Sequence, residues 1–279
     1  MKLAYVLTED GRRVVTFYEN GRFLEIDHEG LECVTANPIS VIKAFDVVSK
    51  LGKREVKVRK ILPPVIPQKA FLPAVNFKSH SSETSMTPPP FPYFFTKFSN
   101  AVIGHEDYIL IPKGLNRTDY EGEIGIIIGK RGKNIPKEEA WDYVFGFTIV
   151  NDVSFRDYQF PEVHPYGLNW VMGKALDTAL PIGPWIVTKD EVDFHKLRII
   201  TRLNGEVVQD GSVEDMIFGV EDMIAYLSKG ITLEPGDLIT TGTPAGVAEF
   251  GRKSYLKEGD VIEVEVEGIG VLRNYVKVV

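Results

Sequence analysis

The sequence predicts an α+β fold that is mainly β, with a small α+β N-terminal domain at residues 1–65 and a larger domain at residues 66–279. Two observations predict the strands. The apolar runs are short and rich in Ile and Val, and Asn-Gly pairs separate β-prone runs, which is the strongest short signal for a hairpin. A third observation places the boundary, because Pro63, Pro64 and Pro67 mark a stiff connection.

The N-terminal domain is expected to hold a hairpin, a helix and one further strand. Residues 14–18 and 22–26 flank Asn20-Gly21 and form the hairpin. Asn37 is suited to cap a helix with Pro38 at its first position, and Gly52 fits the position just after its end. Its apolar face consists of Val41, Ile42, Phe45 and Val48. A strand follows at residues 55–61.

The second domain is expected to alternate strands with a few helices. The predicted strands lie at residues 71–76, 93–98, 108–111, 124–129, 144–150, 197–203, 238–241, 261–266 and 270–279. Helices are predicted at residues 137–143, with Pro136 at the first position, and at 214–229, bent near Gly219.

Three carboxylates adjoin the strands that are predicted to be buried. Glu121 and Glu123 lie two residues apart at the start of an Ile-rich strand, so they project to the same face. Asp152 ends a neighbouring apolar run. Carboxylates at the edge of a core repel each other unless a cation lies between them. All-oxygen ligation favours a hard divalent ion, Mg²⁺ or Mn²⁺ ahead of Ca²⁺. Taken alone, a Glu-x-Glu strand favours a solvated face, and an Asp that closes an apolar run favours a turn. The combination of three carboxylates, each beside a strand that is predicted to be buried, favours the cation.

A short polar segment carries a histidine and a glutamate. Asn76 is suited to cap a short helix on which His80 and Glu83, three residues apart, share a face. One interpretation is an exposed surface segment. The other is a catalytic pair in which Glu83 raises the basicity of His80, so that His80 takes a proton from water.

Further polar residues follow the strand that ends at Asp152. Arg156 and Gln159 share a face with Asp152 if this segment is helical, which leaves Arg156 either beside a metal or in an intrahelical salt bridge. Lys174 ends an apolar segment and points either to the surface or inward as an electrostatic stabiliser. The Gly-rich loop 241–247 is a turn or an anion cradle.

Composition narrows the class of protein. The chain has 279 residues and a net charge of −7 without a block of basic residues, which argues against a nucleic-acid partner. Cys33 is the only cysteine, so a reducing compartment is expected. The apolar run at residues 1–7 is shorter than a signal peptide needs, and no segment has the length to span a bilayer. We therefore expect a cytoplasmic protein.

Five motifs, in order, resemble the fumarylacetoacetate hydrolase family. Asp-Tyr-Glu-x-Glu-Leu is matched at residues 119–124, with Ile in place of Leu. The others are Asn-Asp-Val-Ser-x-Arg-Asp-x-Gln at 151–159, Gly-Lys-x-x-Asp-Thr at 173–178, Pro-x-Gly-Pro-Trp at 181–185 and Thr-Gly-Thr-Pro-x-Gly-Val at 241–247. A family lid motif, Asn-Tyr-x-x-His-x-x-Glu, is matched at 76–83 with Phe77 in place of Tyr.

The resemblance implies a fold, a metal and a site. The fold is a mixed β-roll of the fumarylacetoacetate hydrolase C-terminal-domain type, commonly a homodimer. Mg²⁺ or Mn²⁺ is bound through the residues that match Glu121, Glu123 and Asp152. The implied catalytic residues are His80, Glu83 and Lys174, and the implied substrate-binding residues are Arg156, Gln159, Lys174 and Thr243.

The implied substrate is a small 2-oxo acid. Hydrolysis of a C–C bond in an acylpyruvate-type (2,4-dioxo acid) substrate through a metal-stabilised enolate is the first expectation. Isomerisation or decarboxylation of a hydroxymuconate- or hydroxyhepta-dienedioate-type acid from aromatic catabolism, and oxaloacetate decarboxylation, are the alternatives. A relative that binds a metal or metabolite without catalysis is a different class. It would be indicated by loss of Lys174 or of the His80–Glu83 pair, and all three residues are present.

Overall fold

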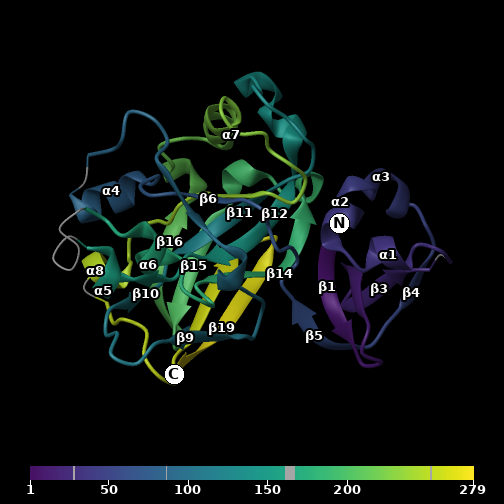
Figure 1. The fold of residues 1–279 in the computed structure, drawn as a ribbon, viewed down its shortest axis with the longest axis horizontal. Coiled ribbons are helices and arrows are strands. Elements are labelled where there is room, and N and C mark those ends of the chain that lie inside the picture. The colour runs from purple at the N-terminus through teal and green to yellow at the C-terminus, as the bar shows by residue number, and fades with distance from the viewer. Residues whose placement is uncertain (28, 86, 161–166, 252) are drawn as a thin grey trace.

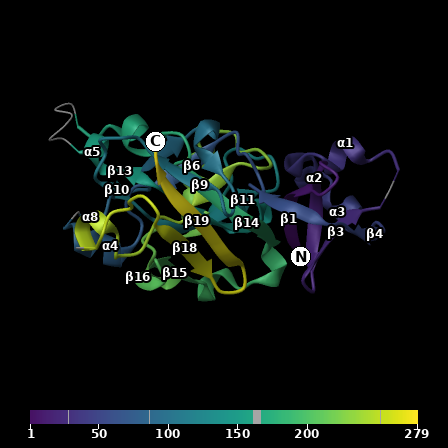
Figure 2. The ribbon, with the colours of Figure 1, turned by 90° about the horizontal axis from the view of Figure 1, so that it is seen from below.

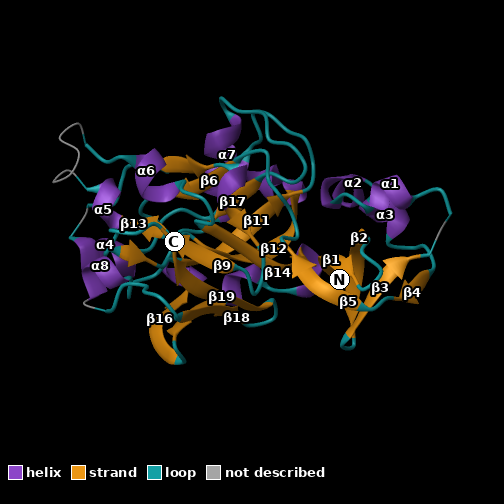
Figure 3. Cartoon of the chain, turned by 60° about the horizontal axis from the view of Figure 1, so that its bottom comes forward, coloured by secondary structure: helices purple, strands orange, loops and turns teal. Residues whose placement is uncertain are grey.

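The computed structural model describes residues 1–27, 29–85, 87–160, 167–251 and 253–279. Two β-sheets dominate it, and short helices lie around their edges (Figures 1 and 3). The predicted α+β, mainly β fold is therefore confirmed. Within the described residues, no helix combines the length and the apolarity that a bilayer-spanning segment requires.

The larger sheet has 12 strands and runs through both parts of the chain. Its main path is β4 (Lys53–Glu55), β3 (Arg22–Ile26), β2 (Arg13–Glu19), β1 (Lys2–Thr8), β14 (Leu180–Thr188), β12 (Val144–Asn151), β11 (Gly122–Ile128), β17 (Leu238–Thr240), β6 (Ala70–Pro73) and β7 (Phe94–Lys97). In addition, β5 (Val58–Leu62) pairs with β1, and β8 (Val102–Ile103) pairs with β14.

The second sheet has five strands. Its strands β15, β16 and β18 lie along the lower side of the molecule in Figure 2. Its order is β16 (Glu206–Ser212), β15 (Arg198–Leu203), β18 (Val261–Val266), β19 (Gly270–Val278) and β9 (Tyr108–Ile111). A separate pair joins β10 (Thr118–Asp119) to β13 (Ser154–Phe155). The hairpins at Asn20-Gly21 and Asn204-Gly205 are confirmed, because β2 pairs with β3 and β15 pairs with β16.

The α-helices are short. They are α1 (Glu32–Thr35), α2 (Pro38–Lys43), α3 (Phe45–Val48), α4 (Lys78–Thr84), α5 (Arg156–Gln159), α6 (Trp170–Lys174), α7 (Val220–Ser228) and α8 (Ala248–Gly251). Turns of 3₁₀ helix occupy Ser99–Ala101, Lys137–Tyr143, Lys189–Glu191, Phe194–Lys196 and Val213–Asp215. Gly219 precedes α7, so the bend predicted near it is confirmed as a break between two helices.

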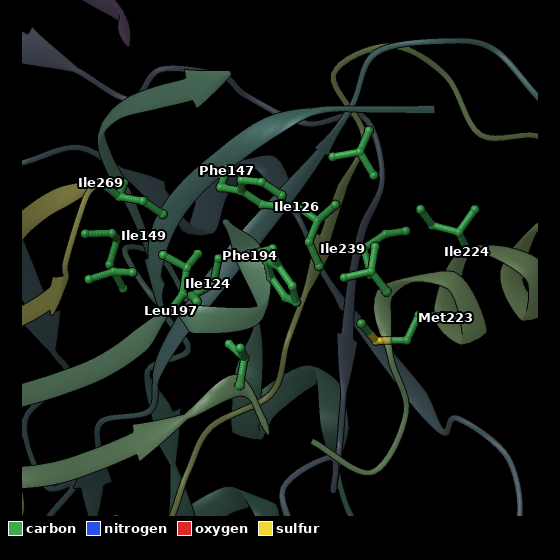
Figure 4. Close-up of a cluster of buried hydrophobic side chains, with 14 of the residues drawn as sticks. Ile124, Ile126, Phe147, Ile149, Phe194, Leu197, Met223, Ile224, Ile239 and Ile269 are labelled. Atoms are coloured by element: carbon green, nitrogen blue, oxygen red, sulfur yellow. The ribbon is translucent and has the colours of Figure 1, made fainter. Parts of the chain in front are cut away.

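The core encloses β11 on both faces. Ile124 and Ile126 project into one cluster, where Figure 4 shows them beside Phe147. Ile127 projects into a second cluster on the opposite face. Because alternate residues of a strand point to opposite faces, burial of both faces explains why β11 reads as an unbroken Ile-rich run.

Several predicted boundaries are wrong. The helix capped by Asn37 is two helices, because Ala44 (ψ 12°) leaves helical geometry and Phe45 packs edge-on against Phe145 of β12. Gly52 does not follow the helix end; its carbonyl accepts a hydrogen bond from the Asp27 amide. Residues 137–143 form a 3₁₀ helix preceded by Pro136, and the predicted strand 55–61 is divided between β4 and β5.

The N-terminal residues share a sheet with the rest of the chain. β1 pairs antiparallel with β14, through Lys2 opposite Val187 and Leu3 opposite Ile186. One hydrogen-bonded ladder thus crosses the boundary that the prolines suggested (Figure 1). The division at residue 65 stays a prediction.

Candidate metal centre and active site

Three buried carboxylates converge where β11 begins and β12 ends. Glu121, Glu123 and Asp152 each offer an oxygen within 4.8 Å of the others. The antiparallel register places Gly122 opposite Asn151. Backbone bonds hold this arrangement, since the Asp152 amide donates to the Glu121 carbonyl at 2.8 Å. The sequence analysis predicted that these three residues would meet, and in the structure they do.

Gly122 lets the acidic strand approach the second sheet. A Cβ at this position would lie 2.2 Å from Oγ1 of Thr201 on β15. The Gly122 amide donates to Oε1 of Gln209 at 3.0 Å, so β11 is anchored to β16 between the two glutamates. A larger residue here would push the carboxylates away from the second sheet.

Two buried lysines balance part of the negative charge. Lys174 at the end of α6 places Nζ 2.8 Å from Oε2 of Glu121 and 2.7 Å from Oδ2 of Asp152. Of the two orientations considered for Lys174, toward the surface or inward, the structure shows the inward one. Lys97 at the end of β7 places Nζ 2.5 Å from Oδ1 of Asp152. Burial lowers the pKa of Lys97 to about 8.

Sequence reasoning missed Lys97. The available signal was a lysine inside a strand of aromatic residues, at a position that alternates into the core with Phe95. Such a lysine also fits an exposed strand edge, so the residue type alone does not reveal its burial. The structure shows that its ammonium also donates to the carbonyls of Val153 and Ala179.

Arg156 opens α5 and is fully engaged. Its Nε and Nη2 contact Asp119, Nη2 reaches Oε1 of Glu121 at 2.5 Å, and Nη1 donates to Oε1 of Gln159 at 2.7 Å. The acidic partners of Arg156 are therefore Asp119 and Glu121, while those of Asp152 are the two lysines. Among the described residues, Asp152 and Arg156 do not form the intrahelical salt bridge that was one of the two interpretations.

The surroundings of the three carboxylates shift their pKa values in different directions. Burial favours neutral Glu121, but Lys174 and Arg156 outweigh it and hold the pKa of Glu121 below its ordinary value. Burial, Asp152 and Glu121 together raise the pKa of Glu123 well above its ordinary value. Burial also raises the pKa of Asp152, against the opposing effect of Lys174 and Lys97.

This donor set fits a hard divalent cation. Oε2 of Glu123 is buried and has no hydrogen-bond partner among the described residues. A buried carboxylate oxygen without a partner is costly. The donors that converge here, within the described part of the chain, are three carboxylates without sulfur or imidazole, which is typical of Mg²⁺ or Mn²⁺ sites.

The Gly-rich loop and the start of α8 hold carboxylates of the chain itself. The Gly246 amide of the loop donates to Glu83, and the Ala248 and Glu249 amides of α8 donate to Asp119. Thr243 is turned toward the strand: its hydroxyl donates to the Gly122 carbonyl at 2.9 Å and accepts from Nε2 of Gln209 at 2.7 Å. Thr243 thus lies beside the site with its hydroxyl engaged. Gln209, which sequence reasoning missed, links the loop to the acidic strand.

The predicted histidine–glutamate pair lies on α4. Nδ1 of His80 is 3.4 Å from Oε2 of Glu83, and the His80 ring is buried beside Phe250 of α8. The prediction that Asn76 caps this helix is wrong, because Phe77 occupies the N-cap position. The amide side chain of Asn76 instead donates to the Thr241 carbonyl and accepts from the Phe218 amide. Phe77 precedes the helix and is buried in the core.

A cavity of about 370 Å³ opens above these groups. His80, Glu121, Arg156, Gln159 and Lys174 form its polar floor. The remaining lining is mostly aromatic and aliphatic, and consists of Ala74, Val75, Thr84, Thr87, Pro89, Tyr93, Phe95, Phe160, Leu168, Trp170 and Phe250. A buried polar floor under apolar walls is the usual form of a small-molecule site.

Comparisons with known proteins identify relatives of this chain. Residues 69–277 match the family model described as fumarylacetoacetate (FAA) hydrolase C-terminal. The chain is 40% identical to the mitochondrial oxaloacetate tautomerase of Homo sapiens over 222 residues, which is 79% of this chain and 70% of that protein. It resembles the fumarylacetoacetate hydrolase structure from Exiguobacterium antarcticum, with 33% identity, a TM-score of 0.82 and full coverage of both chains.

A second solved structure carries the name of an isomerase. The 2-hydroxyhepta-2,4-diene-1,7-dioate isomerase of Mycobacterium marinum is 31% identical, with a TM-score of 0.76 and coverage of 100% of this chain and 98% of that one. The relatives thus differ in named reaction while they share the domain. Because the family model spans most of its length, the chain belongs to the fumarylacetoacetate hydrolase family.

Proposed function

We propose that this chain is a divalent-metal-dependent enzyme that hydrolyses a C–C bond in an acylpyruvate-type (2,4-dioxo acid) substrate by way of its enolate. The observation that supports it is the convergence of Glu121, Glu123 and Asp152. Glu121 joins this cluster to the cavity, which it lines together with His80 and Lys174. A positive charge from Lys174 and a base, His80, thus lie at one small-molecule site.

Glu121, Glu123 and Asp152 would hold the cation. When bound, Mg²⁺ or Mn²⁺ would supply Lewis acidity to the 2-oxo acid. Lys174 adds positive charge at the floor, where the enolate forms. Arg156 holds Glu121 and Gln159 in place through its three engaged nitrogens.

His80 is the base for hydrolysis. Its Nδ1 faces Glu83, so Nε2 takes a proton from a water molecule that adds to the C4 carbonyl. The C3–C4 bond then breaks, and its electron pair becomes the enolate of pyruvate, while C4 leaves as a carboxylic acid. The proton held on His80 returns to C3. One water is consumed, and the products are one carboxylic acid and pyruvate.

Oxaloacetate tautomerisation is the second candidate, because relatives about 40% identical carry that name. Interconversion of enol and keto forms needs the same enolate and a proton-transfer group, but no attack by water. Decarboxylation or isomerisation of a related dicarboxylic acid would also pass through an enolate. The common element of these reactions is the floor of the cavity.

A substrate panel with defined metal tests the proposal. The purified chain would be stripped with chelator and assayed on acetylpyruvate, oxaloacetate and a hydroxymuconate-type acid, with and without Mg²⁺ or Mn²⁺. Metal-dependent formation of pyruvate and a carboxylic acid from acetylpyruvate supports hydrolysis. Turnover of oxaloacetate enol alone would replace it with the tautomerase, and no metal-dependent turnover of any member would contradict the proposed class of enzyme.

A further inference from the structure

The cavity has a charged floor and an aromatic upper part, and the two are in direct contact. Nζ of Lys174 lies 5.0 Å from the ring centre of Phe95. The guanidinium carbon of Arg156 lies 5.9 Å from the ring of Phe160 and 6.0 Å from that of Phe250. A 2-oxo acid whose carboxylate and carbonyl rest on the floor therefore extends its other end directly between aromatic rings.

Flat ring faces shape this upper part. Phe95 stacks on Trp170, with ring centres 4.7 Å apart and planes 8° apart. Tyr93 lies 6.1 Å from Trp170 and is half exposed, so it borders the cavity mouth. Aromatic walls of this kind attract flat apolar groups.

The basic side chains that line the cavity already bind partners at its floor. Apart from His80, the proposed base, the basic side chains among the described lining residues are Arg156 and Lys174. Arg156 uses Nε, Nη1 and Nη2 on Asp119, Glu121 and Gln159. Lys174 bridges Glu121 and Asp152. Within the described lining, the aromatic upper part therefore offers a second carboxylate no free cation.

We propose, on the basis of the proposed function, that the substrate is a monocarboxylate whose acyl end is an uncharged aromatic group, a 4-aryl-2,4-dioxo acid. A dicarboxylate would bring its distal charge against Phe95, Trp170 and Phe250, and burial of an unpaired carboxylate is costly. An aryl group would instead bury apolar surface against the same rings. This class differs from oxaloacetate, which is short and charged at both ends.

Three 2-oxo acids that differ in the distal group test this assignment. The metal-loaded chain would be assayed on 2,4-dioxo-4-phenylbutanoate, acetylpyruvate and oxaloacetate. We expect kcat/KM to fall in that order, with the phenyl acid at least about tenfold above oxaloacetate. A value for oxaloacetate equal to or above that of the phenyl acid would overturn the inference and leave the enzyme class standing.

Calorimetric binding separates this inference from the proposed function. If none of the three acids is turned over, the proposed function is wrong, and the affinities of phenylpyruvate and 2-oxoglutarate then decide the inference. Tighter binding of phenylpyruvate by about tenfold or more supports the aromatic subsite. Equal or tighter binding of 2-oxoglutarate overturns it.

A charge placed at the upper part gives a reciprocal test. Leu168 lines the cavity and is 37% exposed, so Leu168→Arg introduces a cation at a tolerant position. We expect it to shift the kcat/KM ratio by at least about tenfold toward the dicarboxylate. Leu168→Gln is the matched uncharged control and should leave the ratio near that of the parent chain. A ratio unchanged by Leu168→Arg, or moved equally by both variants, would contradict the inference.

Discussion

Glu123 is the carboxylate of the centre with the weakest compensation. Lys174 and Arg156 contact Glu121, and Lys97 and Lys174 contact Asp152. Among the described residues, no ion pair reaches Glu123, and its pKa is raised by burial and by the two neighbouring carboxylates. The native chain without metal therefore binds a proton at Glu123 more tightly than the unfolded chain does.

Glu123→Gln should stabilise the metal-free protein at neutral pH. Because the native pKa is raised, the free energy of unfolding falls as pH rises above the ordinary range of a glutamate, and Gln removes this loss. We expect a gain on the order of 1 kcal/mol or more, since each unit of pKa shift corresponds to about 1.4 kcal/mol. Thermal unfolding at acidic and neutral pH measures it.

The same variant should lose its response to metal. Added Mn²⁺ should raise the Tm of the parent chain at neutral pH and have little effect on Glu123→Gln. A parent chain whose stability advantage over the variant grows with pH in the absence of metal would contradict the account of Glu123.

Lys174→Met tests the role of the ammonium in catalysis. Its charge is worth most when the enolate forms, so kcat should fall by about 10²-fold or more while KM changes far less. Steady-state kinetics would be run with Mn²⁺ present, because removal of this cation leaves Glu121 and Asp152 without one of their partners. A rise in KM alone would make Lys174 a uniform binding group.

Some residues of the site were predictable from the sequence and others were not. Glu121 and Glu123 were predictable because strand periodicity puts them on one face, and Asp152 because it ends the next strand. Lys97 was not, since its partners Val153 and Ala179 lie 56 and 82 residues away. Gln209 is similar, because it becomes part of the site only when β16 packs beside the Gly-rich loop.

At the scale of elements, α4 connects the cavity to the Gly-rich loop. Glu83 accepts from the Gly246 amide, and the Ser79 amide donates to Asp215. His80 is thereby held at the floor of the cavity. The helix itself was predictable from its polar, short sequence. Its anchoring was not, because Asn76 bonds to residues 142 and 165 positions away instead of capping the helix.

His80→Ala should separate hydrolysis from reactions that need no water. Loss of a positioned general base typically costs about 10²- to 10⁴-fold, so acylpyruvate hydrolysis should fall by that order. Any decarboxylation of oxaloacetate should keep much of its rate, because it needs no activated water. Parallel assays of both substrates measure this, with Glu83→Gln as a milder companion variant. Equal loss of both activities would assign the pair to binding.

At the scale of the whole molecule, one ladder of strands joins the N-terminal residues to the acidic centre. β1 pairs with β14, β14 with β12, and β12 with β11, which carries Glu123. The Ile- and Val-rich runs predicted two of these four strands, β11 and β12, whereas β1 and β14 were not predicted. Their order was not predictable, because β1 and β14 are separated by most of the chain and no local signal records their pairing.

The assembly implied by the family resemblance is a homodimer. We expect a solution mass of twice the 31.3 kDa of one chain. Exposed apolar side chains at Phe98, Tyr108 and Val171 are consistent with a covered surface. Light scattering coupled to size exclusion measures the mass, and a single-chain mass at micromolar concentration would contradict the dimer.

The central claim is that Glu121, Glu123 and Asp152 bind a divalent cation on which turnover of a 2-oxo acid depends. The most direct measurement is the rate of 2,4-dioxo acid turnover as Mn²⁺ is titrated into the chelator-stripped chain and into Glu123→Gln, side by side. We predict no turnover without metal, saturable recovery in the parent chain and at least about 10²-fold less in the variant. Full turnover by the stripped parent chain, or by Glu123→Gln, would contradict the claim.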